Sequence, residues 1–437
     1  MRIKKSYKKS YLFITCLAFI TLALVSVKLL SKEQKNNKYP SVPEFVQKTE
    51  LEVIQITINE KYYKKIKKKR AAALNIGVLE TSTSDYVPAT IGYKGKEYRA
   101  EIRLKGDWTD HLTGEKWSFR VKLKGDKTIR GMRKFSLHHP KTRGYVNEWL
   151  YHKVMKGEGI TGLRYGFVEG RLHIKSENSL YYSNKELGIY AIEETFDKRT
   201  IESNQRKESI ILKFSEEYWW NEVKKSNAIG KPYGYLWNKF MNGSMMTRAK
   251  HTITVFSENK VLADSTFHKY FKYSKNSLED LRTGKATLDQ VFDIKELAKY
   301  TAILNLFGAV HGSYIINLRF YYNPITTKLE PIAFDGNSGN KIEKFCHFMF
   351  TKQKKDTAYL VELVKAIREV SSPVYLENLI EKNEKELRYL DTVLKKEFGK
   401  ESFKKANFDH NQQMMIKELS KIEEQIRINL EKQSKEQ

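Results

Sequence analysis

Residues 311–340, HGSYIINLRFYYNPITTKLEPIAFDGNSGN, carry the side chains best suited to chemistry. Asn317 comes just before one strand-like run, and Asp335 ends a second one. An Asn-Pro pair and two threonines separate the runs and predict a turn. We therefore expect a hairpin that brings Asn317 and Asp335 together at its open end. Amide and carboxylate oxygens are ligands that Mg²⁺ takes beside nucleotide phosphates, so this pair is suited to phosphoryl transfer.

Protein kinases use the same two residue types in the same order, with a β-hairpin between them. The spacing has a simpler explanation as well, because Asn317 can cap a turn and Asp335 can start one. His311 opens the segment and is a candidate catalytic base, since histidine accepts a proton near neutral pH. It can equally be a packed, hydrogen-bonded residue, and the sequence leaves both roles open.

Helical patterns flank this segment on both sides. Residues 293–310 have Asp293 as a candidate N-cap, Glu296 as its capping-box partner and an apolar surface beyond Tyr300. They predict a core helix that leads directly to His311. From residue 356 onward the chain is charged and helical, with Pro373 between two helical patterns and a last amphipathic helix over 411–431.

Strand patterns dominate the part of the chain before residue 215. Apolar and polar residues alternate there, and glycines mark the turns. This order predicts an α+β lobe. Its expected strands lie in 51–58, 86–138, 164–174, 187–193 and SIILKF, and its expected helices lie in 61–73, 147–156 and 195–204. The aromatic-rich segment that follows fits either a carbohydrate platform or an insertion packed on the core: Tyr218, Trp219, Trp220, Tyr233, Tyr235 and Trp237.

Composition indicates a folded protein with an anionic partner. The chain has 437 residues, 40% hydrophobic residues and a formal net charge of +27. Such a charge favours an anionic neighbour, which can be a nucleotide, an acidic polymer, a nucleic acid or lipid headgroups. The lysines are spread along the chain, so a dedicated nucleic-acid binder is not expected. Cys16 and Cys346 are far apart in sequence and predict neither a disulfide nor a metal site.

The N-terminus predicts a membrane anchor. Residues 1–10 are basic and form the expected cytoplasmic tail, residues 11–30 form the apolar signal anchor, and residues 31–50 read as a linker. By the positive-inside rule, the chain would be a single-pass protein of the cell membrane with its bulk outside the cytoplasm. The alternative is a cleaved signal peptide and secretion.

Five stretches of the chain resemble the CotH-like kinases, a family named for a spore-coat protein with an atypical kinase fold. They are RLKGDWTDHLTGEKWSFRVKL, NEWLYHKVMKGEGI, ELGIYAIEETFDK, SIILKF and the hairpin ending FDGNSG, in family order over roughly 90–340. The resemblance implies an atypical bilobal protein-kinase-like fold of the α+β class, with a mainly antiparallel N-terminal sheet and a helical C-terminal part. With the anchor helix in front, the kinase domain would cover 51–350 and a helical extension 351–437.

The resemblance also implies roles for single residues, with Mg²⁺ and ATP as cofactors. Asn317 and Asp335 match the metal ligands. The remaining matched residues would surround the nucleotide, with Lys116 also acting in catalysis: Arg103, Lys105, Gly106, Lys116, Glu193, Glu194 and Lys213. The alternative for the cations among them is an exposed strand face. Glu148 lies on the helix where a kinase places the glutamate that orients its lysine.

One departure from the family pattern affects the expected activity. Family kinases carry an aspartate a few residues before the asparagine, but here no acid occurs between Glu296 and Glu330, and His311 stands near that place. We expect a kinase that moves phosphate from Mg²⁺-ATP to a hydroxyl of a protein or surface glycan at the bacterial envelope. The alternatives are a pseudokinase that acts in envelope assembly and a scaffold that binds acidic polymers.

Overall fold

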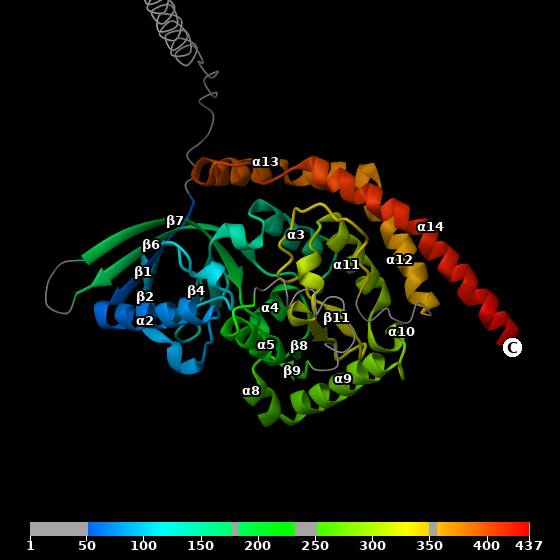
Figure 1. Cartoon of the computed structure of the whole chain (residues 1–437), viewed down its shortest axis with the longest axis horizontal. Helices are drawn as coiled ribbons and strands as arrows, with labels where there is room; N and C mark the ends of the chain where they lie inside the picture. Colours follow the sequence, from blue (N-terminus) through cyan, green and yellow to red (C-terminus); the bar gives the residue numbers. More distant parts are fainter. Residues whose placement is uncertain (1–50, 177–181, 232–250, 349–355, 437) are drawn as a thin grey trace, which may run out of the picture. The chain divides into compact units, whose positions relative to one another are not determined.

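The computed structural model describes residues 51–176, 182–231, 251–348 and 356–436. Residues Leu51–Gln437 form one compact unit (Figure 1). The predicted tail, anchor and linker, as well as Tyr233, Tyr235 and Trp237 of the aromatic segment, lie outside the described residues. The predicted boundary between residues 350 and 351 stays a prediction.

The first part of the unit is a closed barrel in the order β1-β2-β3-β4-β5-β7-β6. Neighbouring strands are antiparallel except at the closure, where β1 runs parallel to β6 and Val53 pairs with Glu169. The alternating apolar residues of these strands fill the barrel interior. The strands are β1 (Val53–Asn59), β2 (Val87–Tyr93), β3 (Lys96–Leu104), β4 (Phe119–Leu123), β5 (Lys134–His138), β6 (Tyr165–Lys175) and β7 (Tyr182–Glu194).

This closure corrects the predicted fold class. We predicted the mainly antiparallel N-terminal sheet of a bilobal kinase-like fold, and the structure has a closed seven-stranded barrel instead. The reason is that period-two alternation identifies a strand and its buried face but carries no information on which edges join. The prediction of a helical C-terminal part is confirmed.

A second sheet has the order β11-β10-β8-β9 and is antiparallel throughout. Its strands are β8 (Ile211–Phe214), β9 (Ile253–Val255), β10 (Arg319–Tyr322) and β11 (Leu329–Pro331). The predicted hairpin is confirmed as β10 and β11, with Tyr321 opposite Glu330. Asn317 precedes β10 in a short 3-10 helix, and Asp335 follows β11.

Helices α8 (Glu258–Ala263), α9 (Ser265–Thr283) and α11 (Ile294–Leu306) pack against this second sheet, whereas α2 (Glu60–Ile76) packs against the barrel (Figure 1). Helix α11 lies in the helical core and packs against α12 (Thr357–Val370) and α14 (Lys405–Glu436). Its predicted cap is confirmed, because the Asp293 side chain accepts hydrogen bonds from the amides of Lys295 and Glu296 at 3.1 Å. The helices are α2 (Glu60–Ile76), α3 (Val146–Gly157), α4 (Lys198–Ser203), α5 (Glu217–Ala228), α8 (Glu258–Ala263), α9 (Ser265–Thr283), α10 (Leu288–Val291), α11 (Ile294–Leu306), α12 (Thr357–Val370), α13 (Pro373–Phe398) and α14 (Lys405–Glu436).

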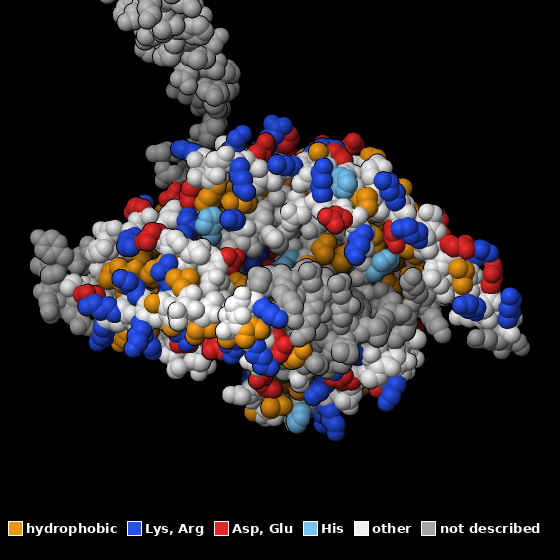
Figure 2. All heavy atoms as spheres, viewed as in Figure 1, with side chains coloured by type: hydrophobic (Ala, Val, Ile, Leu, Met, Phe, Trp, Pro, Cys, Tyr) orange, Lys and Arg blue, Asp and Glu red, His pale blue; other side chains and the backbone are white. Residues whose placement is uncertain are grey.

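In the part of the chain that the structure describes, no helix is both long and apolar enough to cross a bilayer. We therefore correct two predictions, because no described element supports them. One is the membrane helix, and the other is a single-pass location with the bulk of the chain outside the cytoplasm. Figure 2 shows Lys and Arg side chains distributed over the visible face among acidic and apolar ones, as expected from their spread along the sequence.

The first turn of α11 gives a testable pH dependence. Burial, together with the neighbouring Glu330 carboxylate, raises the pKa of Glu296 to about 8 from an ordinary value of 4.5. The folded protein thus keeps a proton that the unfolded chain releases, so stability should fall as pH rises through this window. Glu296→Gln stays neutral, and we expect it to gain about 1–2 kcal/mol over the native protein at pH 8 but little at pH 4.5.

Thermal unfolding at both pH values measures this difference, with the exposed Glu401→Gln as control. An equal change in melting temperature at pH 4.5 and pH 8 would contradict the pKa shift of Glu296.

Candidate active site

A cavity of about 910 Å³ lies where the barrel meets the second sheet. Its walls come from the end of β3 and the loop after it, the end of β7, strand β8, and the segments that carry Asn317 and Asp335. The size is within the range of cofactor and small-molecule sites. Most of the residues predicted from the sequence to act on a nucleotide line it: Arg103, Lys105, Gly106, Glu193, Glu194, Lys213, His311, Asn317 and Asp335.

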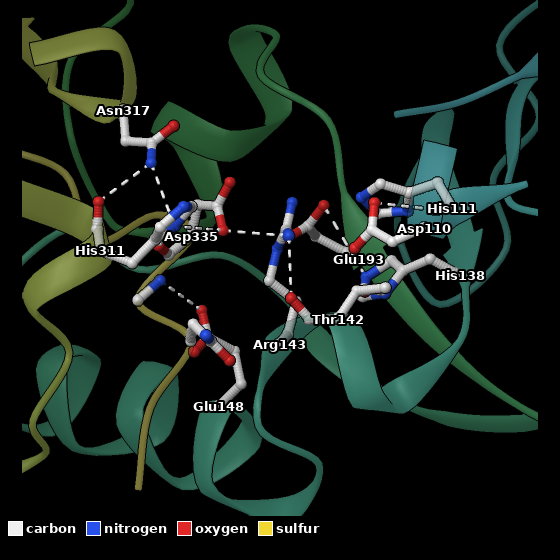
Figure 3. A network of polar contacts seen from close by, with 12 residues as sticks. Asp110, His111, His138, Thr142, Arg143, Glu148, Glu193, His311, Asn317 and Asp335 are labelled. Atoms are coloured by element: carbon white, nitrogen blue, oxygen red, sulfur yellow. Dashed lines mark hydrogen bonds and ion pairs between the residues drawn. The ribbon is translucent and has the colours of Figure 1, made fainter. Parts of the chain in front are cut away.

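Asp335 lines the cavity and lies between His311 and Arg143 in a network of polar contacts (Figure 3). Its Oδ1 contacts Nη1 of Arg143 at 3.0 Å and Nδ1 of His311 at 3.1 Å. The Asn317 amide nitrogen lies 3.1 Å from the same ring nitrogen and donates to the His311 carbonyl at 2.9 Å. Burial opposes ionisation of Asp335, but the Arg143 and His311 contacts hold its pKa well below the usual range. The hairpin therefore does bring these three residues together, with an ionised carboxylate among them.

A second buried carboxylate, Glu193, lies on the other side of Arg143 (Figure 3). Its Oε2 is 3.4 Å from Nζ of Lys105, and its Oε1 is 3.6 Å from Nε of Arg143. Burial alone would raise the pKa of Glu193, but the Lys105 and Arg143 cations lower it to about 2. Burial, with the neighbouring Arg143 charge, lowers the pKa of Lys105 to about 8. Glu193, and not Glu148, is thus the carboxylate beside the candidate phosphate-binding lysine.

Glu148 has a different position from the predicted one. It is fully buried on α3 and accepts hydrogen bonds from the Gly336 amide at 2.9 Å, the Ser338 amide at 3.2 Å and the Ser338 hydroxyl at 2.8 Å. Asp335 itself and Asn337 have positive φ angles of 51° and 48°, which L residues rarely adopt. Glu148 therefore holds the strained turn that presents Asp335 to the cavity.

Four cations on the cavity wall have a buried donor nitrogen that makes no hydrogen bond. Within the described residues, Nζ of Lys105 and Nε of Arg120, Arg143 and Arg319 make no hydrogen bond, although Glu193 lies within ion-pair distance of Lys105 and Arg143. Buried donors are normally paired, so such a group around a cavity indicates an anionic ligand. Phosphate oxygens fit this set of donors, and a nucleotide triphosphate therefore suits the site.

The side-chain oxygen atoms of Asp335 and Asn317 are of the kind that Mg²⁺ binds. No cluster of three or more His, Cys, Asp or Glu side chains with metal-binding geometry occurs in the described segments. Asp335 and Asn317 would thus provide only part of a metal coordination shell. Mg²⁺ typically takes one or two protein ligands and completes its shell with water and substrate phosphates, and this donor set fits that pattern.

Lys116 is the predicted site residue that the structure does not bring to the cavity. Its Nζ donates to the Ile189 carbonyl at 2.8 Å and contacts Oε1 of Glu397, near the end of α13, at 2.5 Å. The rings of Tyr190 and Phe398 lie about its ammonium at 5.3 and 5.1 Å. These contacts connect the barrel to the C-terminal helices.

Sequence reasoning missed Arg143, Arg120, Arg319 and His138. Arg143 belongs to a short 3-10 helix, Pro140–Arg143, that shows no periodicity. Arg319 is the first residue of β10 and stands two positions after Asn317, so its place at the cavity could have been inferred from the hairpin itself. His138 is buried at the end of β5, with Nε2 at 3.9 Å from Glu193.

The family model described as "CotH kinase protein" matches residues 102–433. The chain belongs to the CotH kinase family. This confirms the resemblance seen in the sequence, and it extends the matched region through α12, α13 and most of α14. A kinase-related function follows from membership of the CotH kinase family. No curated protein matches the chain.

Proposed function

We propose that this CotH kinase family member transfers a phosphoryl group from Mg²⁺-bound ATP to a hydroxyl of a protein or a glycan. One observation carries the proposal: an ionised Asp335 and the Asn317 amide face a cavity whose buried cations have unused donors. Lys105, Arg143 and Arg319 would bind phosphate oxygens, while Glu193 would orient Lys105. Asp335 and Asn317 would hold Mg²⁺, which when bound neutralises charge between the phosphates.

The absence of an acidic residue before Asn317 does not by itself remove catalysis. Phosphoryl transfer passes through a loose transition state, so positioning and electrostatic stabilisation provide most of the rate. His311 is a weak candidate for the base at neutral pH, because the Asp335 carboxylate, acting against burial, raises the pKa of the imidazole. We propose instead that His311 mainly orients Asp335 through Nδ1.

The raised pKa of His311 favours a pseudokinase as the second candidate. An imidazole with a raised pKa holds a proton more readily than a free one and is less available to accept the acceptor's proton, and the chain offers no acid between Glu296 and Glu330 to replace it. A pseudokinase of this design would bind ATP and Mg²⁺ through the same residues without transferring phosphate.

Labelled ATP supplied to the purified full chain tests both candidates. We expect Mg²⁺-dependent incorporation of label into the chain itself, a hydroxyl-rich peptide mixture or an oligosaccharide mixture, and no incorporation with EDTA. A thermal shift on adding ATP and Mg²⁺ without any labelled product would favour the pseudokinase. If ATP and Mg²⁺ give no thermal shift and no labelled product forms, the proposed nucleotide binding at this cavity is contradicted.

A further inference from the structure

Two backbone segments adjoin the candidate metal ligands and are packed directly against each other. One follows α11 and leads to His311 and Asn317, and the other follows Asp335. The Gly339 amide donates to the Phe307 carbonyl at 2.7 Å. Gly308 has a φ of 56°, and a Cβ there would lie only 1.9 Å from the Asn340 carbonyl oxygen. This contact leaves no room for a side chain, so the two segments are fixed at close approach.

A single side chain from the C-terminal helix α14 connects both segments. Asn411 is 1% exposed. Its amide nitrogen donates to the carbonyls of Leu306 and Asn340, both at 2.9 Å, and its carbonyl oxygen accepts from the Ile342 amide at 2.9 Å. Both N–H donors and the acceptor oxygen of this amide are therefore used. Leu306 ends α11, whereas Asn340 and Ile342 belong to the segment after Asp335.

Neighbouring residues of α14 add to this connection. Asn407, one turn before Asn411, donates to the Gly339 carbonyl at 2.8 Å, and Nε2 of His410 lies 3.0 Å from the Ile342 carbonyl. Glu148 holds the other end of the segment at Gly336 and Ser338. The chain between Asp335 and Ile342 is thus held by α3 at its start and by α14 at its end.

We propose that Asn411 is a positioning residue that sets Asp335 relative to Asn317, and that α14 is therefore an integral part of the catalytic unit. The inference rests on the proposed function, because it assigns these two residues to one Mg²⁺ ion. Under this proposal, α14 affects metal binding without touching the metal. Without the hydrogen bonds of Asn411, the segments after Leu306 and after Asp335 are no longer attached to the same side chain.

Asn411→Ala in the full chain tests this role, with Gln412→Ala as the matched control. Gln412 is the next residue of the same helix, is also buried, and also donates two hydrogen bonds, but to the carbonyls of Val370 and Ser372 at the α12–α13 junction. We expect Asn411→Ala to raise the Mg²⁺ concentration for half-maximal transfer by about tenfold with a smaller change in kcat. Amide hydrogen exchange in residues 336–342 should also accelerate by about tenfold or more.

Gln412→Ala should lower the melting temperature by a similar amount and leave both the Mg²⁺ dependence and the exchange of 336–342 unchanged. Equal effects of the two variants on Mg²⁺ dependence or exchange would overturn the proposal. If Asn411→Ala does not fold, Asn407→Ala, which removes only the bond to Gly339, should give the same pattern at smaller size, and its absence would overturn the proposal as well.

The outcome is separable from that of the proposed function. If the native protein transfers no phosphate, the kinase proposal fails, but Mg²⁺ binding measured by calorimetry with ATP and the exchange of 336–342 still compare the two variants. Unaltered Mg²⁺ affinity and exchange in Asn411→Ala would then reject the positioning role alone.

Discussion

Asp335→Asn is expected to reduce phosphoryl transfer by about 100-fold or more while ATP remains bound. The loss follows from removing the charge that would hold Mg²⁺ against the phosphates, since single electrostatic groups in such sites contribute about 10²–10³ in rate. The variant also leaves Arg143 and His311 without their carboxylate partner, so some loss of stability is expected in addition.

Asp356→Asn separates these two effects. Asp356 has the same 8% exposure as Asp335 and accepts hydrogen bonds from the amides of Leu288 and Tyr359, away from the cavity. Both variants should unfold at lower temperature than the native protein, and only Asp335→Asn should lose transfer measured well below its melting temperature. Native-level transfer by folded Asp335→Asn would refute the assignment of the metal ligand.

Lys105→Met is expected to raise the KM for ATP by about 10–100-fold. Its buried ammonium lies beside Glu193, has an unused donor and faces the cavity, so a phosphate would gain a charge-assisted hydrogen bond there. Lys116→Met is the matched control, because the resemblance to the CotH-like kinases implies a phosphate-binding role for both lysines. Lys116 contacts Ile189 and Glu397 instead, so its replacement should lower the melting temperature and leave the KM for ATP within about threefold. If Lys116→Met raised the KM for ATP and Lys105→Met left it unchanged, the phosphate-binding role would belong to Lys116.

The same lysine predicts a pH profile. With a pKa of about 8 in the free protein, Lys105 loses its charge as pH rises through that value. The kcat/KM for ATP, which reports groups of the free enzyme, should therefore fall above pH 8. In Lys105→Met this limb of the profile should disappear, and a limb that persists would assign the titration to another group.

The parts of this protein that were predictable are those determined by nearby residues. The β10–β11 hairpin and the Asp293 cap follow from turn residues and side chains within a few positions of each other. The convergence of Asn317 and Asp335 could be predicted for the same reason. Barrel closure could not, because β1 and β6 meet only through pairing between strands that are distant in sequence.

The site partners of the predicted residues were hidden for a related reason. Lys105 and Lys116 follow the same kind of strand pattern, and only the fold shows that one faces a cavity and the other the end of α13. Glu148 was expected beside a lysine because of its place on the helix. The structure pairs it with backbone amides of Gly336 and Ser338, and no local pattern near residue 148 indicates those partners.

The parallel closure of the barrel has a consequence for how the chain reaches its native state. Val53 must find Glu169, so the first strand stays without one of its two neighbours until the β6 segment has been made. Pairings across such long separations form slowly because the intervening loop must first be ordered. We therefore expect β1 to be a late-docking element with an aggregation-prone edge before it docks, and refolding to be slower than the hairpin and helices alone would allow.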